Sequence, residues 1–116
     1  MKKYNKIVLT GASGRLGSYL REPLSKITKK LVSTDKDDIG KTLHNEVFKK
    51  LNIKNFKDVN KILKKTDLII HFGGYSNEGP FQEILDSNIL GTYNIWKSAK
   101  KNKIKRIIFA SSIHSV

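Results

Sequence analysis

Short apolar runs alternate with helix-patterned segments along the whole chain. The runs are KIVLT (6–10), KLVSTD (30–35), a weaker EVFKKLNI (46–53), DLIIHFGG (67–74) and KRIIFASS (105–112). Because most of these runs are continuously apolar, they are typical of strands in a sheet that is covered on both faces. Strands that alternate with helices predict a parallel sheet joined by right-handed crossovers.

Three segments between these runs have helical spacing. A first helix is predicted after Gly14 by the spacing of Leu16, Leu20, Leu24 and Ile27. A second is predicted by Phe56, Val59, Ile62 and Leu63. A long third helix has one face marked by Phe81, Ile84, Leu85, Ile89, Trp96 and Ala99. Pro23 should kink or shorten the first helix, whereas Pro80 suits the first turn of the third. We therefore expect one domain, residues 1–116, of α/β class. It should be a Rossmann-like, doubly wound parallel sheet of about five strands, in the order 3-2-1-4-5 and truncated.

Composition excludes several classes of protein. The chain has 116 residues and a net charge of +13, but 20 of its 23 basic residues are lysines scattered along the chain. Five of them, Lys54, Lys57, Lys61, Lys64 and Lys65, fall on the outer face of the second helix. Such a pattern is typical of solvated surfaces and does not indicate a specific nucleic-acid partner.

No cysteine is present, so disulfides and thiolate sites are excluded. The apolar stretch near the N-terminus is too short for a signal peptide, and no run reaches membrane-spanning length. We expect a cytoplasmic protein without membrane contact. His, Asp and Glu show no metal-ligand spacing, so no metal is predicted, and His71 is interpreted as a buried structural residue.

The stretch LTGASGRLGSYL places Gly11, Gly14 and Gly17 between the first strand and the first helix. In that context one glycine allows a tight turn, another lets the backbone approach a pyrophosphate, and a third lets the helix pack closely. The helix N-terminus adds N–H donors and a positive dipole end. The spacing, G-x-x-G-x-x-G, is one residue longer than the usual dinucleotide fingerprint.

Asp35 ends the second strand, eighteen residues after Gly17. An acidic residue at this place binds the adenosine ribose hydroxyls and repels a 2′-phosphate. Together with the glycine stretch, it predicts NAD as the cofactor. Lys36 and Arg15 could accommodate a phosphate, so NADP is kept as the less favoured alternative.

Five motifs in order, TGASGRLG, the Asp that closes the second strand, DLIIHFGG, NILGTYNI and RIIFASS, resemble the extended short-chain dehydrogenase/reductase family, the NAD-dependent epimerases and dehydratases. The resemblance runs from residue 4 to the last residue. Within that family LREPL (20–24), residues 71–100 and RIIFASSIH (106–114) are similar to the uronate dehydrogenase branch. That branch implies oxidation of the C1 hydroxyl of a hexuronic acid to a lactone, with hydride transfer to NAD.

The resemblance also implies a site. The family's pyrophosphate loop is matched by Gly11, Ser13, Gly14, Arg15, Leu16 and Gly17, and its ribose ligand is matched by Asp35. The pair beside the adenine, where the family usually has Asp and an aliphatic residue, is matched by Asn52 and Ile53. Gly73 and Gly74 match the backbone beside the inner ribose, and Asn88 the helix asparagine that supports the active site. Ser112 matches the catalytic serine, which hydrogen-bonds the reacting hydroxyl, and Ser76 and His114 match residues that hold the sugar acid.

The chain departs from the family pattern at two places. Ile113 stands where the uronate dehydrogenase branch has Asn, which leaves the sugar open. The family's catalytic Tyr-x-x-x-Lys pair follows the last motif, and its only spacing match here, Tyr93 and Lys97, lies earlier, on the long helix. We therefore expect this chain alone to bind NAD without catalysis. The alternatives are a nucleotide-sugar epimerase or dehydratase and a non-catalytic NAD-binding module; a homo-oligomer of the complete protein stays open.

Overall fold

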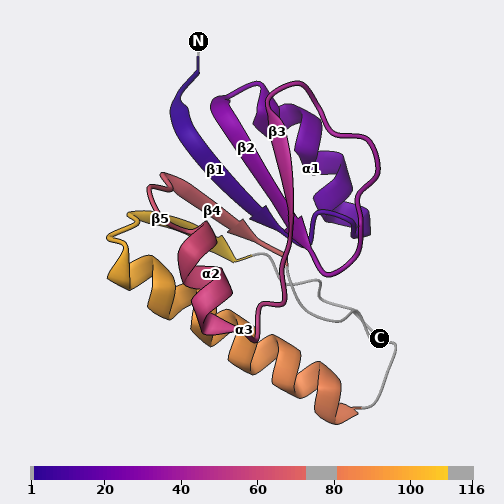
Figure 1. Ribbon diagram of the computed structural model, residues 1–116, viewed down its shortest axis with the longest axis vertical. Coiled ribbons are helices and arrows are strands. Elements are labelled where there is room, and N and C mark those ends of the chain that lie inside the picture. Colours follow the sequence, from indigo (N-terminus) through magenta and orange to yellow (C-terminus); the bar gives the residue numbers. More distant parts are fainter. Residues whose placement is uncertain (1, 73–80, 110–116) are drawn as a thin grey trace.

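The structure, a computed structural model, describes residues 2–72 and 81–109, and of residues 81–88 the backbone only. The described residues form eight elements (Figure 1). They are β1 (Tyr4–Thr10), α1 (Arg15–Ser25), β2 (Thr28–Asp35), β3 (Glu46–Lys50), α2 (Phe56–Ile62), β4 (Leu68–His71), α3 (Phe81–Lys101) and β5 (Arg106–Phe109).

The five strands form one sheet in the order β3-β2-β1-β4-β5, and every neighbouring pair is parallel. Both the strand order and the parallel pairing predicted from the sequence are confirmed. Because all strands run in the same direction, their carboxyl ends meet at one edge of the sheet. Thr10 lies there between its register partners Thr34 and His71, so the glycine stretch, Asp35 and the end of β4 are neighbours.

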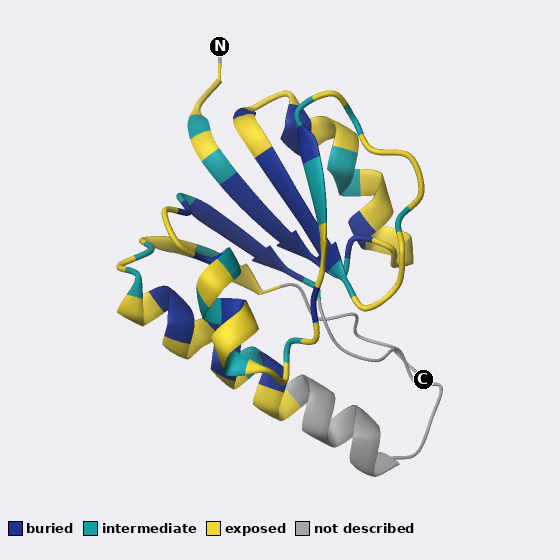
Figure 2. Cartoon of the chain, in the orientation of Figure 1, coloured by how far each residue is buried: buried dark blue, intermediate teal, exposed yellow. Residues whose placement is uncertain are grey.

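Helices cover both faces of the sheet, as the apolar runs predict. Successive residues of β1 face opposite sides, so Ile7 and Leu9 join the core under α1 while Val8 joins the core under α2 and α3. Figure 1 shows α1 beside β1–β3 and the pair α2 and α3 on the other side. Figure 2 shows the central strands buried along most of their length and the outer helix faces exposed.

The buried side of α3 differs from the one predicted. Ile89 is 62% exposed and Trp96 is 49% exposed, so these two residues of the expected stripe do not face the core, although Ala99 does. The other three, Phe81, Ile84 and Leu85, have no described side chains. Gly91 instead approaches Ile53 so closely that an added Cβ would lie 2.3 Å from its Cδ1. The small residue permits close packing of the helix, which turns Ile95 rather than Trp96 into the core.

Other local predictions agree with the structure. α1 ends at Ser25, two residues after Pro23. The five lysines of the second helix region, Lys54, Lys57, Lys61, Lys64 and Lys65, are all exposed. β5 lies at the edge of the sheet, where Ile108 and Phe109 are about half exposed. Among the described residues, no helix has both the length and the apolar character that crossing a membrane requires.

Candidate functional site

The glycine stretch forms a tight turn between β1 and α1. Gly11 has φ of +72°, a left-handed conformation that glycine adopts without a steric penalty. The Gly14 N–H donates to the Gly11 carbonyl at 3.1 Å and closes the turn, while the Ala12 N–H donates to the Thr34 carbonyl at 3.1 Å. The second bond attaches the turn to the end of β2.

Close backbone contacts on both sides of the turn require glycine. A Cβ added to Gly17 would lie 2.1 Å from the Gly11 carbonyl oxygen, so no other residue fits there without movement of the backbone. A Cβ added to Gly11 would lie 2.9 Å from the backbone of Phe72, directly after β4. The turn is therefore held between the first turn of α1 and the end of β4, which is the close packing that the glycine spacing predicts.

The N-terminus of α1 opens from this turn toward solvent. Gly14 is the N-cap residue and has no side chain to satisfy the first N–H groups of the helix. The first N–H groups of any helix have no intrahelical acceptor. Arg15 and Leu16, the first two residues of α1, are exposed here, whereas the N–H groups of Ser13 and Gly14 already donate to Asp35 and Gly11. The site thus presents unshielded donors at the positive end of the helix dipole, which is the arrangement that binds phosphate groups.

Asp35 lies beside the turn, although twenty-two residues separate it from Ser13. One carboxylate oxygen, Oδ2, accepts a hydrogen bond of 2.9 Å from the Ser13 N–H, and Oδ1 accepts one of 3.2 Å from the Asp37 N–H. A carboxylate has about four acceptor positions, so capacity remains for two further donors such as the hydroxyls of a ribose. The carboxylate and the helix N-terminus are thus brought together at one edge.

An ion pair that sequence reasoning missed supports the segment after Asp35. Arg21 of α1 donates to both carboxylate oxygens of Glu46 at 2.7 and 2.6 Å, and Ser33 donates to the same carboxylate at 2.5 Å. Burial alone raises the pKa of Glu46, but the hydrogen bonds from Arg21, Ser33 and the Leu43 N–H outweigh it and lower that pKa overall. Arg21 also donates to the Lys41 carbonyl at 2.9 Å, so the pair holds the loop between β2 and β3.

His71, the last residue of β4, is buried beneath the same edge. Its Nδ1 lies 2.5 Å from Thr10 Oγ1 and its Nε2 lies 3.4 Å from Thr92 Oγ1. Burial lowers the pKa of His71 to about 4, so the ring is neutral near pH 7. The prediction that this histidine is buried is confirmed.

Four further residues singled out from the sequence are described, two in the segment after β3 and two on α3. Asn52 is exposed, and its Oδ1 accepts a hydrogen bond from the Lys54 N–H at 3.0 Å. Ile53 packs against α3, and its carbonyl accepts from the Asn94 amide at 2.9 Å. The Nζ of Lys97 lies 5.9 Å from the Tyr93 ring centroid and 4.8 Å from that of Phe56, so Lys97 reaches toward α2.

The remaining candidates lie outside the described residues. Gly73, Gly74, Ser76, Ser112 and His114 fall in segments that the structure leaves out, and Asn88 lies on α3 without a described side chain. Their roles stay predictions. Among the residues that are described, no group of three or more His, Cys, Asp or Glu side chains is placed to hold a metal ion.

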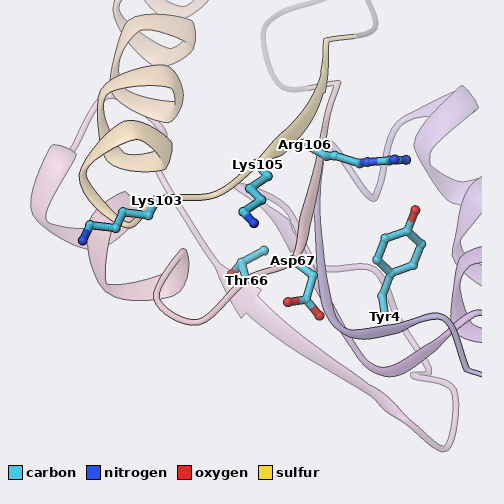
Figure 3. Close-up of a pocket in the computed structure, with 6 residues that line it drawn as sticks. All are labelled: Tyr4, Thr66, Asp67, Lys103, Lys105 and Arg106. Atoms are coloured by element: carbon cyan, nitrogen blue, oxygen red, sulfur yellow. The ribbon is translucent and has the colours of Figure 1, made fainter.

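A pocket of about 360 Å³ lies at the opposite edge of the sheet, near the amino ends of β1, β4 and β5 (Figure 3). Its lining residues are Tyr4, Thr66, Asp67, Lys103, Lys105 and Arg106. The Asp67 carboxylate accepts from the Asn5 and Lys6 N–H groups at 2.6 and 3.2 Å and therefore serves to fix the start of β1. Ligands of parallel sheets bind beyond the carboxyl ends of the strands, so this pocket is not the candidate site.

Comparison with known proteins gives a family match over almost the whole chain. Residues 7–116 match the NAD dependent epimerase/dehydratase family. The chain belongs to this family. The match includes the last four residues of β1, the glycine turn, Asp35 and every described element after β1.

Among relatives of this family member are uronate dehydrogenases. The enzyme of Pseudomonas syringae pv. tomato is 38% identical over 115 residues, which cover 97% of this chain and 42% of the relative. The enzyme of Agrobacterium fabrum is 35% identical over 96% of this chain and 42% of the relative. The crystal structure of uronate dehydrogenase from Agrobacterium tumefaciens superposes with a TM-score of 0.89 at 34% identity, over 98% of this chain and 43% of that one. A mutant of that enzyme has been solved in complex with NAD, and its TM-score is 0.88 at 34% identity, over 97% and 43%. The chain thus spans less than half the length of these relatives.

Proposed function

We propose that residues 1–116 are the N-terminal, NAD-binding portion of an NAD-dependent hexuronate dehydrogenase. The observation that carries the proposal is the junction of the glycine turn and Asp35, joined by the Ser13 hydrogen bond at the carboxyl edge of the sheet. The similarity to uronate dehydrogenases over nearly the whole chain supports the choice of reaction. Because the chain spans only 42% of those relatives, the remaining substrate-binding residues are proposed to lie beyond it.

The described residues fit a dinucleotide. Gly11 and Gly17 let the turn pack closely against the end of β4 and the first turn of α1, and the helix N-terminus offers N–H donors to a pyrophosphate. Asp35 would accept hydrogen bonds from the two hydroxyls of the adenosine ribose, and its charge would repel a 2′-phosphate, which favours NAD over NADP. We place the adenine beside Asn52 and Ile53, and the inner ribose beside Gly73 and Gly74.

The chemistry assigned to this chain is orientation of the substrate. NAD, when bound, accepts the hydride that leaves C1 of the sugar acid. Ser112 would hydrogen-bond the reacting C1 hydroxyl and Asn88 would support that region from α3. Ser76 and His114 would hold the sugar acid. Beside them, Ile113 would change the contacts to the sugar, because the uronate dehydrogenase branch has Asn at this position. The proposed ligand is thus a small sugar acid. We further propose that the protein is cytoplasmic and that the complete protein can form a homo-oligomer.

Calorimetric titration of the purified chain with NAD and with NADP tests the cofactor proposal. We expect saturable NAD binding that is tighter than NADP binding. Asp35→Asn should weaken NAD by about ten- to a hundredfold, the effect of removing charge-assisted hydrogen bonds worth about 1.5–3 kcal/mol. Asp38→Asn, on the exposed loop that follows, is the control with the same change of charge. An absence of NAD binding, or equal losses in the two variants, contradicts the cofactor site.

The reaction is tested separately, by following NADH formation with glucuronate or galacturonate. The chain alone is expected to be inactive, and the chain extended by the coding sequence that follows codon 116 is expected to be active. Turnover of a nucleotide sugar in place of the hexuronates would assign the epimerase or dehydratase alternative. NAD binding without turnover of either substrate class by the extended protein would assign the non-catalytic module.

A further inference from the structure

Arg21 is a largely buried charge of α1 to which the proposed function gives no role. It belongs to LREPL (20–24), one of the stretches that resemble the uronate dehydrogenase branch. Only 14% of its side chain is exposed, and none of the side chain of its partner Glu46, at the start of β3. A guanidinium that is removed from water in this way must bring its donors onto acceptors. The position of those acceptors therefore indicates what the residue does.

The Arg21 guanidinium divides its donors between a carboxylate and a loop. Nε and one terminal nitrogen form a bidentate pair with the two carboxylate oxygens of Glu46, at 2.7 and 2.6 Å. The same terminal nitrogen donates to the Lys41 carbonyl at 2.9 Å. Glu46 in turn accepts from the Leu43 N–H at 3.0 Å. Two residues of the loop between β2 and β3, which runs beside α1 (Figure 1), are thus held on one ion pair.

The first half of the same loop connects this ion pair to Asp35. The Asp37 N–H donates to Asp35 Oδ1 at 3.2 Å. The Gly40 N–H donates to Asp38 Oδ1 at 3.1 Å, and between these two residues Ile39 packs against the core cluster under α1. Contacts therefore follow one another at every one or two residues from the end of β2 to the ion pair. Release of the loop from the ion pair would loosen the Asp37 donor as well.

We propose that Arg21 is a positioning residue that sets the preference of the site for NAD over NADP. By holding the loop after Asp35, it keeps the Asp37 N–H on one carboxylate oxygen and keeps the carboxylate where it would meet the ribose. A carboxylate at that place accepts from ribose hydroxyls and repels a 2′-phosphate, so its position affects the two cofactors in opposite directions. The inference rests on the proposed function for its consequence, the cofactor preference, but not for the anchoring of the loop.

A lysine at position 21 would keep the positive charge but not this arrangement. The planar guanidinium offers five N–H donors in fixed directions, whereas an ammonium is a compact charge at the end of a flexible stem. An ammonium can balance the charge of Glu46, but it lacks the fork that bonds both carboxylate oxygens and the Lys41 carbonyl together. We therefore expect Arg21→Lys to retain the ion pair and to release the loop.

The anchor is tested first, without NAD, through the Nε–H signals of the arginines in the ¹⁵N-labelled chain. The other two arginines, Arg15 and Arg106, are exposed and are internal references. We expect the Arg21 Nε–H, assigned with Arg21→Lys, to exchange with water about tenfold more slowly than the references, as for one retained hydrogen bond. The Leu43 amide should exchange faster in Arg21→Lys than in the wild type. Exchange of the Arg21 Nε–H at the rate of the references, or an unchanged Leu43 amide, overturns the proposal.

The cofactor preference is tested by titrating Arg21→Lys with NAD and with NADP, at a temperature at which circular dichroism shows the variant to be folded. We expect NAD affinity to fall about three- to tenfold, the equivalent of one neutral hydrogen bond. NADP affinity should fall less or rise, so the ratio of the two affinities narrows. Leu63→Ala is the matched control, because it destabilises the chain from the core on the other face of the sheet. It should leave the ratio unchanged.

The outcomes separate this inference from the proposed function. An unchanged ratio in Arg21→Lys, or the same narrowing in Leu63→Ala, overturns the positioning role while NAD binding by the wild type still supports the proposed function. If the Arg21 Nε–H is protected but the wild-type chain binds neither dinucleotide, the anchoring stands, and both the proposed function and the cofactor preference fail. If Arg21→Lys does not fold, Ser33→Ala, which removes the serine donor to Glu46, takes its place and is judged by the same narrowing of the ratio.

Discussion

Acidification from pH 7 to pH 5 should destabilise the protein through His71. Its pKa is lowered to about 4 in the folded protein because burial disfavours the charged ring, whereas an unfolded chain has the ordinary value of about 6.5. Above the unfolded pKa both states are neutral and the residue has no effect on stability. As the pH falls below it, the unfolded state binds a proton that the folded state refuses. The loss grows until the pH reaches the folded pKa.

The size of this loss follows from the difference between the two pKa values. Each pKa unit corresponds to about 1.36 kcal/mol, so the free energy of unfolding should fall by about 2 kcal/mol between pH 7 and pH 5 through this group alone. Urea unfolding followed by circular dichroism at the two pH values measures it. His71→Asn is the reference because it has no group at this position that titrates in the range. All other ionisable side chains are the same in the two proteins.

Two results would refute the reasoning. If the wild type and His71→Asn lose the same free energy of unfolding between pH 7 and pH 5, the folded ring does not resist protonation. Direct titration of the His71 ring protons in the wild type gives a second reading that does not depend on the variant. A measured pKa near 6.5 in the folded protein would contradict the burial argument.

Two further predictions concern the polar and glycine contacts of the site. Glu46→Gln leaves Arg21 without its carboxylate and should lower the free energy of unfolding by about 3 kcal/mol, as for a buried ion pair that loses one partner. Glu22→Gln removes one partner of the exposed ion pair with Lys26, one helical turn away, and should change the free energy of unfolding by less than about 0.5 kcal/mol. Similar urea midpoints for the two variants would show that the buried pair contributes no more to stability than the exposed one. Gly17→Ala should cost about 1–3 kcal/mol through overpacking against the turn and weaken NAD binding. Gly14→Ala, whose Cβ would meet the same carbonyl at 3.2 rather than 2.1 Å, should cost less in thermal unfolding, and the reverse order would disprove the packing argument.

The strand order and the two covered faces could be predicted because they follow from patterns with a short period. Continuous apolar runs such as LIIH indicate buried strands, and their alternation with helices admits few topologies. The glycine turn was also predictable, because Gly17 is required by a contact only a few residues away, with Gly11. Strand ends were less predictable: β3 ends at Lys50 rather than at Ile53, since Ile53 packs against a helix that follows much later.

The orientation of α3 shows why hydrophobic periodicity was insufficient. Residue size marks Ile89 and Trp96 as core residues, but the helix approaches Ile53 through Gly91, a small residue that the pattern does not count. The Arg21–Glu46 pair was equally hidden, because twenty-five residues separate two charges that look like ordinary surface groups. Neither contact has a local signal in the chain.

The sequence by itself determined the fold class, the glycine turn and the acidic end of the second strand, because each depends on residue type and spacing within one strand or turn. Only the tertiary structure decided that the Asp35 carboxylate bonds the Ser13 N–H and that His71 joins β1, β4 and α3. Those contacts join residues twenty-one to sixty-one positions apart. Their geometry depends on how parallel strands are placed side by side and how a helix lies across them, which no local pattern of residues specifies.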